Sequence, residues 1–386
     1  MKIGFISTYF YPAEGGAERV CLSNARELAK KHEVHVYTSD RKCGKLLGPN
    51  EEKIFSINVH RCRELIRLGY YFASYPSMLW KVLKQDLDIV HVESIGFLQH
   101  DVIILLKKIF SPKTKFVNTP HGPYISRNNS IPARMVKALI GFFENPVNSI
   151  YSATTIMSPA QEDWLPNVNL RNPIVIPAGL PKDFFRIVNA KDFVVKYGLE
   201  SKTIITYIGR IQEYKGIQHV LQCFGKILEK HPDTVFVIGG IDDGYLQELK
   251  RIAKEKNLEK NVAFMGEIDE ETKIKALEVS DIYVFPSEWE AFGISMLEAM
   301  ARGNAIISTK TEGGRFLIKE GENGFLYDFG NVVQLENELT NLLDNIKIRQ
   351  SMQEKNRMLA KKFLWPSLVK QIENVYVKVL NENRKN

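Results

Sequence analysis

The sequence predicts an α/β protein of two domains, each built on a parallel sheet. Short apolar runs typical of strands alternate with helical patterns along the chain, and this alternation favours parallel sheets. The chain has 386 residues, which exceeds the size at which a single hydrophobic core keeps growing. Prolines and glycines gather in residues 171–184, so the domain boundary is expected there.

In the first half, apolar β-type runs predict strands separated by helical patterns. One such pattern, residues 17–30, carries Val20, Leu22, Ala25 and Leu28 on or near one face, as an amphipathic helix does. The predicted strands are residues 3–6, 34–37, 89–92, 115–117 and 154–157.

The second half repeats this scheme more regularly. Its predicted strands are residues 203–208, 235–238, 262–264, 282–285 and 305–308, and its predicted helices are residues 218–229, 245–256, 270–279 and 294–301. A last helical pattern follows Trp365-Pro366, with apolar residues at helical spacing from Leu368 to Val379.

Composition narrows the class of protein. Apolar residues make up 44% and charged residues 25%, as in an ordinary globular protein, and no apolar run is long enough to predict a transmembrane helix. The first residues are interpreted as a strand, since they lack the features of a signal peptide. The four cysteines show no metal-binding or disulfide spacing, so reduced thiols and a cytoplasmic location are expected. The net charge of +7 suits an anionic partner, but no nucleic-acid motif accompanies it.

Residues 286–298 are the most informative stretch for function. They follow a predicted strand and consist of a short loop and the start of a helix, where free backbone N–H groups and the helix dipole favour an anion such as a diphosphate. Glu290 and Glu298 would be about 12 Å apart if both were helical. That separation is too large for two carboxylates flanking one glycosidic bond. A nucleotide-diphosphate sugar, with sugar, diphosphate and ribose in a row, fits this layout.

Two cations, Arg210 and Lys215, follow the predicted strand 203–208. Open parallel sheets bind ligands beyond the carboxyl ends of their strands, so these cations would balance a diphosphate and stabilise charge on a leaving group. Solvated surface charges are the alternative, and the adjacent Gly209 and Gly216 favour the functional interpretation. For Glu290 and Glu298 the alternatives are a helix cap and a helix-surface carboxylate.

Five motifs, in order along the chain, resemble those of glycosyltransferase family 4, the retaining group 1 type with the GT-B fold. They are the glycine loop 10–19, Thr119-Pro120-His121-Gly122, Ile176-Pro177-Ala178-Gly179, the stretch 209–216 and Glu290-x7-Glu298. Two departures are Ala178, where the family has asparagine, and Arg315-Phe316-Leu317, where it has an Ile-Pro-Glu-like continuation.

The resemblance implies two Rossmann-like domains whose parallel sheets face a central cleft. Residues 1–178 would form the acceptor side, residues 179–363 the nucleotide-sugar donor side, and residues 364–386 a helix that crosses back to the first domain. It also implies retaining transfer from a nucleotide-diphosphate sugar, with UDP favoured over GDP, to a glycan or lipid-linked hydroxyl. No cofactor or essential metal is expected, because Arg210, Lys215 and the helix terminus already provide positive charge. Asp86-Leu87-Asp88 is interpreted as structural.

The resemblance also assigns residues to the site. His121, Glu290, Arg210 and Lys215 are expected to be catalytic. His91 and Glu93 end a predicted strand, and acceptor-binding and core roles both stay open for them. The residues expected at the donor, besides those cations and Glu290, are Gly15, Gly16, Met265, Gly266, Phe292, Gly293, Ile294 and Glu298. Gly15 and Gly16 would permit positive φ and a close backbone approach.

Three first-half segments, 61–84, 105–115 and 131–143, mix cations with large apolar residues. Such a face could rest on an anionic membrane surface, while amphipathic helices covering a sheet are the alternative. Two other functions also stay open: another GT-B reaction, such as that of a nucleotide-sugar epimerase or a phosphorylase, and a non-catalytic module that binds a nucleotide sugar or a membrane.

Overall fold

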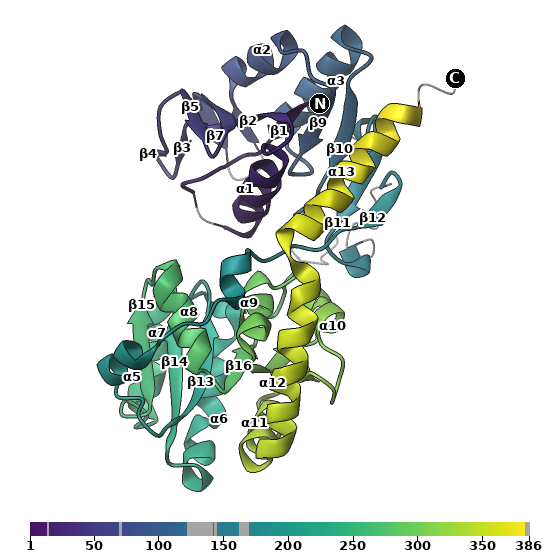
Figure 1. Cartoon of the computed structure of the whole chain (residues 1–386). Coiled ribbons are helices and arrows are strands. Elements are labelled where there is room, and N and C mark those ends of the chain that lie inside the picture. The colour runs from purple at the N-terminus through teal and green to yellow at the C-terminus, as the bar shows by residue number, and fades with distance from the viewer. Residues whose placement is uncertain (14, 69–71, 122–141, 143–144, 162–169, 383–386) are drawn as a thin grey trace. The chain divides into compact units, whose positions relative to one another are not determined.

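A computed structural model describes residues 1–13, 15–68, 72–121, 142, 145–161 and 170–382 (Figure 1). The chain divides into two compact units. The first consists of Met1–Gly179 together with Trp365–Asn386, and the second of Leu180–Leu364. Each unit is an α/β layer structure around its own sheet, so the predicted fold class is confirmed.

The first unit contains a twisted sheet in which β1 (Lys2–Ile6) is central. Neighbouring strands pair in parallel except at one edge, where β5 runs antiparallel to β6. The order across the sheet is β12 (Pro173–Val175), β11 (Ala153–Ile156), β10 (Lys115–Asn118), β9 (Ile89–Val92), β1, β2 (Glu33–Ser39), β6 (Ile57–Cys62) and β5 (Glu51–Ile54). Helices α1 (Gly16–Leu28), α2 (Pro76–Lys84) and α3 (Leu98–Phe110) connect these strands.

The helix α13 (Trp365–Asn381) belongs to the first unit although the whole second unit precedes it in the sequence. It contacts α1, β10 and β11 (Figure 1). Its buried face includes Leu368, Ile372 and Tyr376. The Tyr376 hydroxyl shares a 2.5 Å hydrogen bond with Nδ1 of His91 on β9. The prediction that the last helix returns to the first unit is therefore confirmed.

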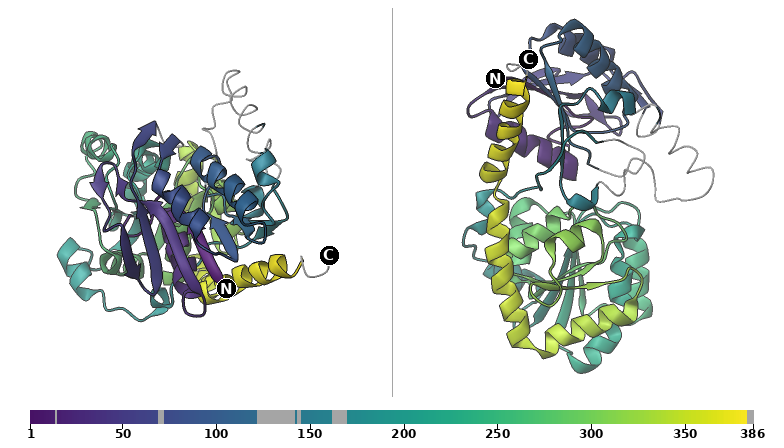
Figure 2. Two further views of the ribbon diagram at one scale, coloured as in Figure 1. Left: turned by 90° about the horizontal axis from the view of Figure 1, so that it is seen from above. Right: turned by 90° about the vertical axis from the view of Figure 1, so that its right-hand side faces the viewer.

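The second unit has a fully parallel sheet with helices on both faces (Figure 2). Its order is β15 (Val262–Gly266), β14 (Thr234–Gly239), β13 (Thr203–Ile208), β16 (Ile282–Phe285), β17 (Ala305–Thr309) and β18 (Gly324–Tyr327). The helix α6 (Ile217–Lys230) contacts α7 (Leu246–Glu255) and α11 (Val332–Asp344), whereas α9 (Ile294–Arg302) contacts α8 (Glu270–Val279) and α12 (Ile346–Ala360). Short helices α5 (Lys191–Tyr197) and α10 (Glu312–Leu317) complete it.

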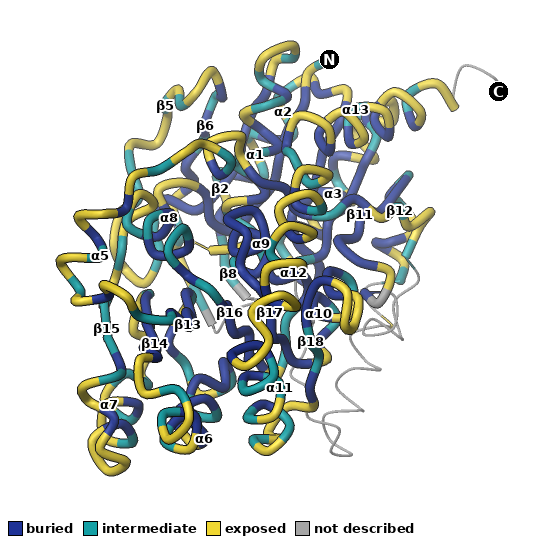
Figure 3. The backbone as a smooth tube through the Cα atoms, turned by 60° about the horizontal axis from the view of Figure 1, so that its bottom comes forward, coloured by how far each residue is buried: buried dark blue, intermediate teal, exposed yellow. Residues whose placement is uncertain are grey.

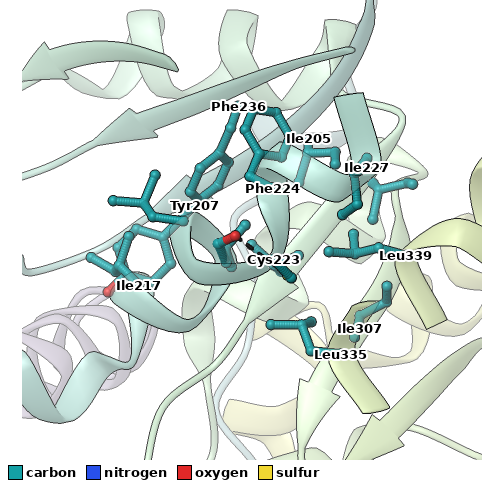
Figure 4. Close-up of a cluster of buried hydrophobic side chains, with 14 of the residues drawn as sticks. Ile205, Tyr207, Ile217, Cys223, Phe224, Ile227, Phe236, Ile307, Leu335 and Leu339 are labelled. Atoms are coloured by element: carbon teal, nitrogen blue, oxygen red, sulfur yellow. Dashed lines mark hydrogen bonds between the residues drawn. The ribbon is translucent and has the colours of Figure 1, made fainter. Parts of the chain in front are cut away.

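Burial on both faces explains why these strands are continuous apolar runs. Five of the six residues of β13 are buried, and the strands are largely dark blue in Figure 3. The core on one face joins Ile205 and Phe236 from the sheet to Phe224 of α6 and Leu335 and Leu339 of α11 (Figure 4). This packing orients the sheet edge on which the site is built.

Both sheets change winding direction beside their first strand. In the first unit β1 lies between β2 and β9, and in the second unit β13 lies between β14 and β16. Ligands of open parallel sheets bind beyond the carboxyl ends of the strands at this switch point. Ligand-binding residues are therefore expected in the loops after β13 and β16 and in those after β1 and β9.

Buried histidines make the stability of the first unit depend on pH. Burial lowers the pKa of His91 to about 4 against the raising influence of Glu93, and burial lowers the pKa of His100 to about 3. Since both folded-state pKa values lie below the unfolded value of about 6.5, the unfolded chain binds more protons in acid. The stability that these two neutral histidines contribute is therefore present above pH 6.5 and is lost as the pH falls toward 4 for His91 and toward 3 for His100.

We predict that His91→Gln reduces this pH dependence. Between pH 7 and pH 5 the wild-type free energy of unfolding should fall by roughly 2 kcal/mol more than that of the variant, because one pKa unit corresponds to about 1.4 kcal/mol. Urea unfolding at the two pH values measures the difference. Identical pH dependence in both proteins would contradict a neutral, buried His91.

Candidate functional site

The loop 286–293 connects β16 to α9 at the switch point of the second sheet. Gly293 caps α9 with φ of 86°, in the left-handed region that favours glycine, and no side chain among the described residues hydrogen-bonds to this helix end as a cap. The first N–H groups of α9 are thus left for another partner. Together with the helix dipole they form an anion-binding arrangement.

Two glycines hold this loop by close backbone contact. A Cβ atom on Gly216 would lie 2.0 Å from the carbonyl oxygen of Pro286, and one on Gly313 would lie 2.1 Å from that of Phe292. Hydrogen bonds add to the contact, because Glu288 N donates to Tyr214 O at 2.8 Å and Gly313 N donates to Glu290 O at 3.2 Å. Any side chain at either glycine would displace the loop.

The structure brings Lys215 and Glu290 together. Lys215 ends a short 3-10 helix after β13, and its Nζ donates to Glu290 Oε2 at 2.6 Å. Lys215 is buried, and Glu290 is partly buried. The pair therefore puts one cation and one hydrogen-bond acceptor beside the anion-binding end of α9.

Arg210 lies at the same sheet edge and is exposed. Its guanidinium donates to the Tyr214 hydroxyl at 3.1 Å and lies 3.6 Å from a carboxylate oxygen of Asp243. Its carbonyl oxygen accepts a hydrogen bond from Tyr207, which fixes the backbone while the side chain stays accessible. Such a cation can move toward an anionic ligand at little cost.

Glu298 lies one turn into α9 and is only 2% exposed. Lys273 of α8, itself buried, donates to its Oε1 at 2.8 Å. Lys273 was not predicted from the sequence. The one signal for it was a lysine on the buried face of a helix, next to Ile274 and Leu277. Through its hydrogen bond, Lys273 fixes the position of the buried Glu298 side chain.

Met265 and Gly266 end β15, two strands away from β13. Gly266 has φ of 72°, and its carbonyl oxygen accepts a hydrogen bond from Gly240 N at 2.8 Å. Gly240 is a second residue of this site that was not predicted from the sequence. A Cβ atom there would lie 1.9 Å from Gly209 O, so the close packing depends on glycine. The ends of β13, β14 and β15 thus form one close-packed backbone surface.

In the first unit, Glu93 and His121 follow the adjacent strands β9 and β10. Glu93 Oε2 lies 2.5 Å from His121 Nε2, and the carboxylate is fully buried. Burial acts to raise the pKa of Glu93, but His91 and His121 outweigh it and lower the pKa. The ionised carboxylate orients the His121 ring. Gly122, in the same motif, lies outside the described residues.

His91 takes the core role that the sequence analysis left open. It has no exposed surface, and its two ring nitrogens hydrogen-bond to Tyr376 and Thr119. The structure therefore does not bring His91 to a ligand-facing surface. Asp88 is also structural, since its Oδ2 accepts a hydrogen bond from Lys2 N at 2.7 Å.

The glycine loop does not use a positive φ at Gly15. This residue caps α1 with φ of 169°, an extended conformation open to any residue. A Cβ on Gly15 would instead meet the Glu18 carboxylate, at the far end of a flexible side chain. Gly16 begins α1, and Glu14 lies outside the described residues. A close backbone approach of this loop to a ligand stays a prediction.

Known protein families match most of both units of this chain. The family model "Glycosyltransferase Family 4" matches residues 14–184, and "Glycosyl transferases group 1" matches residues 190–358. N-acetyl-alpha-D-glucosaminyl L-malate synthase of Bacillus anthracis is 26% identical over 100% of this chain and 98% of its own length. Phosphatidyl-myo-inositol mannosyltransferase of Mycobacterium tuberculosis is 22% identical over 100% and 99%.

Solved structures share the fold. Sucrose-phosphate synthase of Thermosynechococcus elongatus superposes with a TM-score of 0.80 at 20% identity, covering 99% of both chains. The Anabaena protein HepE, in complex with UDP and glucose, has a TM-score of 0.78 at 17% identity and covers 98% of this chain and 100% of its own.

We predict that Gly313→Ala destabilises the second unit by at least about 1 kcal/mol, because the added methyl group meets the Phe292 carbonyl. The matched control is Gly225→Ala in α6, another helical glycine, where an added Cβ meets nothing within 4 Å. That control should gain roughly 0.5–1 kcal/mol from helix propensity. Thermal unfolding compares the two variants. Equal melting temperatures would contradict a close backbone contact between Gly313 and Phe292.

Proposed function

We propose that this chain, which belongs to glycosyltransferase family 4, transfers a sugar from a UDP-sugar to a hydroxyl of a lipid-linked or glycan acceptor. The enzymes of this family are retaining, have the GT-B fold and use nucleotide-sugar donors. The observation that carries the proposal is the Lys215–Glu290 pair beside the uncapped start of α9. UDP is favoured over GDP because HepE, which shares the fold, was solved with UDP.

In this proposal the diphosphate lies at the start of α9. The backbone N–H groups of Phe292, Gly293 and Ile294, or those next to them, would bind its oxygens, with Arg210 and Lys215 as counter-charges. Donor binding would draw Lys215 from Glu290, which leaves the Glu290 carboxylate to accept hydrogen bonds from sugar hydroxyls. Glu298, held by Lys273, would accept from the ribose diol. Backbone groups at Met265 and Gly266 would hold the base.

The reaction breaks the bond between the anomeric carbon and the diphosphate oxygen. Arg210, Lys215 and the α9 terminus stabilise the negative charge that grows on the leaving diphosphate. An acceptor oxygen forms the new bond on the same face of the sugar, and its proton passes to the departing diphosphate oxygen. His121, oriented by Glu93, is proposed to bind the sugar beside the anomeric centre.

A lipid acceptor is supported by the exposed face of α3. Leu98, Val102, Leu105 and Ile109 are exposed at helical spacing, opposite a buried face that includes Ile104. We call these four residues the α3 stripe. An apolar stripe of this kind suits insertion at a bilayer surface, and the net charge of +7 would favour anionic lipids. Most of the segment 131–143, also expected to be amphipathic, lies outside the described residues.

Two relatives act on lipids by name, the mannosyltransferase described above and the alpha-monoglucosyldiacylglycerol synthase of Streptococcus pneumoniae. In the described part of the chain, no helix has the length and apolar character needed to cross a bilayer. We therefore propose peripheral association with the cytoplasmic face of a membrane.

We predict that the double variant Leu105→Ser/Ile109→Ser binds vesicles containing phosphatidylglycerol at least about tenfold more weakly than the wild type, because each apolar side chain that enters the bilayer contributes on the order of 1 kcal/mol. Ile187→Ser, at a fully exposed position of the second unit, is the control and should bind as the wild type does. Vesicle co-sedimentation gives the affinities. Wild-type affinity in the double variant would exclude the α3 stripe as the membrane contact.

The donor proposal is tested by thermal shift with UDP, GDP and ADP. UDP at 100 times its dissociation constant should stabilise the protein by about 2.7 kcal/mol. Arg210→Ala should lose most of this shift, whereas Arg251→Ala, on α7 and with a side chain 56% exposed against 58% for Arg210, should keep it. A shift with GDP alone would show that the site prefers guanine to uracil. No shift with any nucleotide would overturn the proposed donor site.

Product analysis separates this function from its alternatives. With a UDP-sugar and a glycolipid or glycan acceptor, a glycoside should form in which the sugar keeps the anomeric configuration that it had in the donor. Turnover of the donor without any acceptor would favour an epimerase, dependence on inorganic phosphate a phosphorylase, and binding without turnover a non-catalytic module.

A further inference from the structure

A pocket of about 570 Å³ lies in the second unit, between the end of α10 and the last turns of α12. Its lining is largely apolar. Phe316, Leu317 and Ile318 contribute from one side, and Met358 and Leu359 from α12. Leu317 and Ile318 are buried, whereas Met358 is exposed at the mouth. This volume is in the range of small-molecule sites, which are concave and mostly apolar.

The mouth of the pocket is rich in cations. Arg315, Lys355 and Lys362 line it, and within the described residues no carboxylate lies at ion-pair distance from any of them. The fourth cation, Lys319, pairs with Glu322, the one carboxylate among the lining residues. The pocket thus combines an apolar interior with four cations and one carboxylate, Glu322, whose pKa is lowered by Lys319 first and also by Lys355. The excess of positive charge is complementary to a ligand with an apolar chain and an anionic end.

We propose that this pocket binds an amphiphilic phosphate, with its alkyl chain against Leu317, Ile318 and Met358 and its phosphate among Arg315, Lys355 and Lys362. Arginine and lysine bind phosphate through charge-assisted hydrogen bonds, and the apolar interior excludes a purely polar anion as the preferred occupant. The pocket does not include the loop 286–293, although its lining residue Phe316 packs against Phe292 of that loop, with ring centroids 6.0 Å apart.

The test is the affinity of the whole protein for monododecyl phosphate, dispersed below its micelle concentration, by titration calorimetry in the absence of a donor. Lys355→Glu and Met358→Ser should each weaken binding by about tenfold or more. Lys361→Glu and Ile346→Ser are the controls. They change an exposed cation that neighbours Lys362 in sequence and an exposed apolar residue at the other end of α12, neither of which lines the pocket, and they should bind as the wild type does.

Several outcomes would overturn the proposal. If inorganic phosphate bound as tightly as monododecyl phosphate, the apolar lining would contribute nothing to binding. If dodecanol bound as tightly, the cations would contribute nothing. Equal losses in the variants and in their controls would show binding elsewhere on the surface.

A second arm identifies the source of the ligand. Binding to phosphatidylcholine vesicles that contain phosphatidic acid, lost in Lys355→Glu, would support a bilayer lipid. Lys355-dependent binding of the dispersed phosphate alone would support a soluble amphiphile. Because no donor is present and no turnover is measured, a failure of the UDP-sugar proposal leaves this result unaffected.

Discussion

Backbone-to-backbone packing around the loop 286–293 is the constraint on which the rest of the proposed donor site depends. Gly216, at the start of α6, and Gly313, in α10, approach the loop from two sides so closely that neither position has room for a Cβ atom. These contacts set the direction in which α9 begins and hold the Glu290 backbone at Gly313. The charges follow from this geometry, since Lys215 immediately precedes Gly216 and reaches Glu290 from there.

The same principle organises the neighbouring strands. Gly240 allows β14 to end against the carbonyl oxygen of Gly209, and the backbone N–H of Gly240 donates to Gly266. The switch point therefore presents mainly main-chain groups and a few charged side chains. A site of this kind binds phosphate and base edges through fixed dipoles, which need little rearrangement when a ligand arrives.

Much of the fold could be predicted because its parallel strands are buried on both faces. The strand 282–285 has the predicted bounds for this reason. In contrast, β6, next to the sheet edge, has no continuous apolar run and shows only a short alternation of buried and partly exposed residues. The helix α12 buries Arg349 and Asn356 beside Met352, which interrupts the apolar stripe typical of a helix. The Lys273–Glu298 pair was unpredictable because tertiary packing joins residues on two separate helices. His91 was ambiguous because a histidine at a strand end can face either a core or a ligand.

The return of α13 has a consequence for how the protein is made. The sheet of the first unit leaves the ribosome early, but the helix that covers β10 and β11 follows only after the whole of Leu180–Leu364 has been translated. At bacterial or eukaryotic elongation rates this interval is on the order of ten seconds or more. During that time His91 lacks its Tyr376 partner, and the apolar surface under α13 is open to chaperones. The second unit, being continuous in sequence, can complete its fold first.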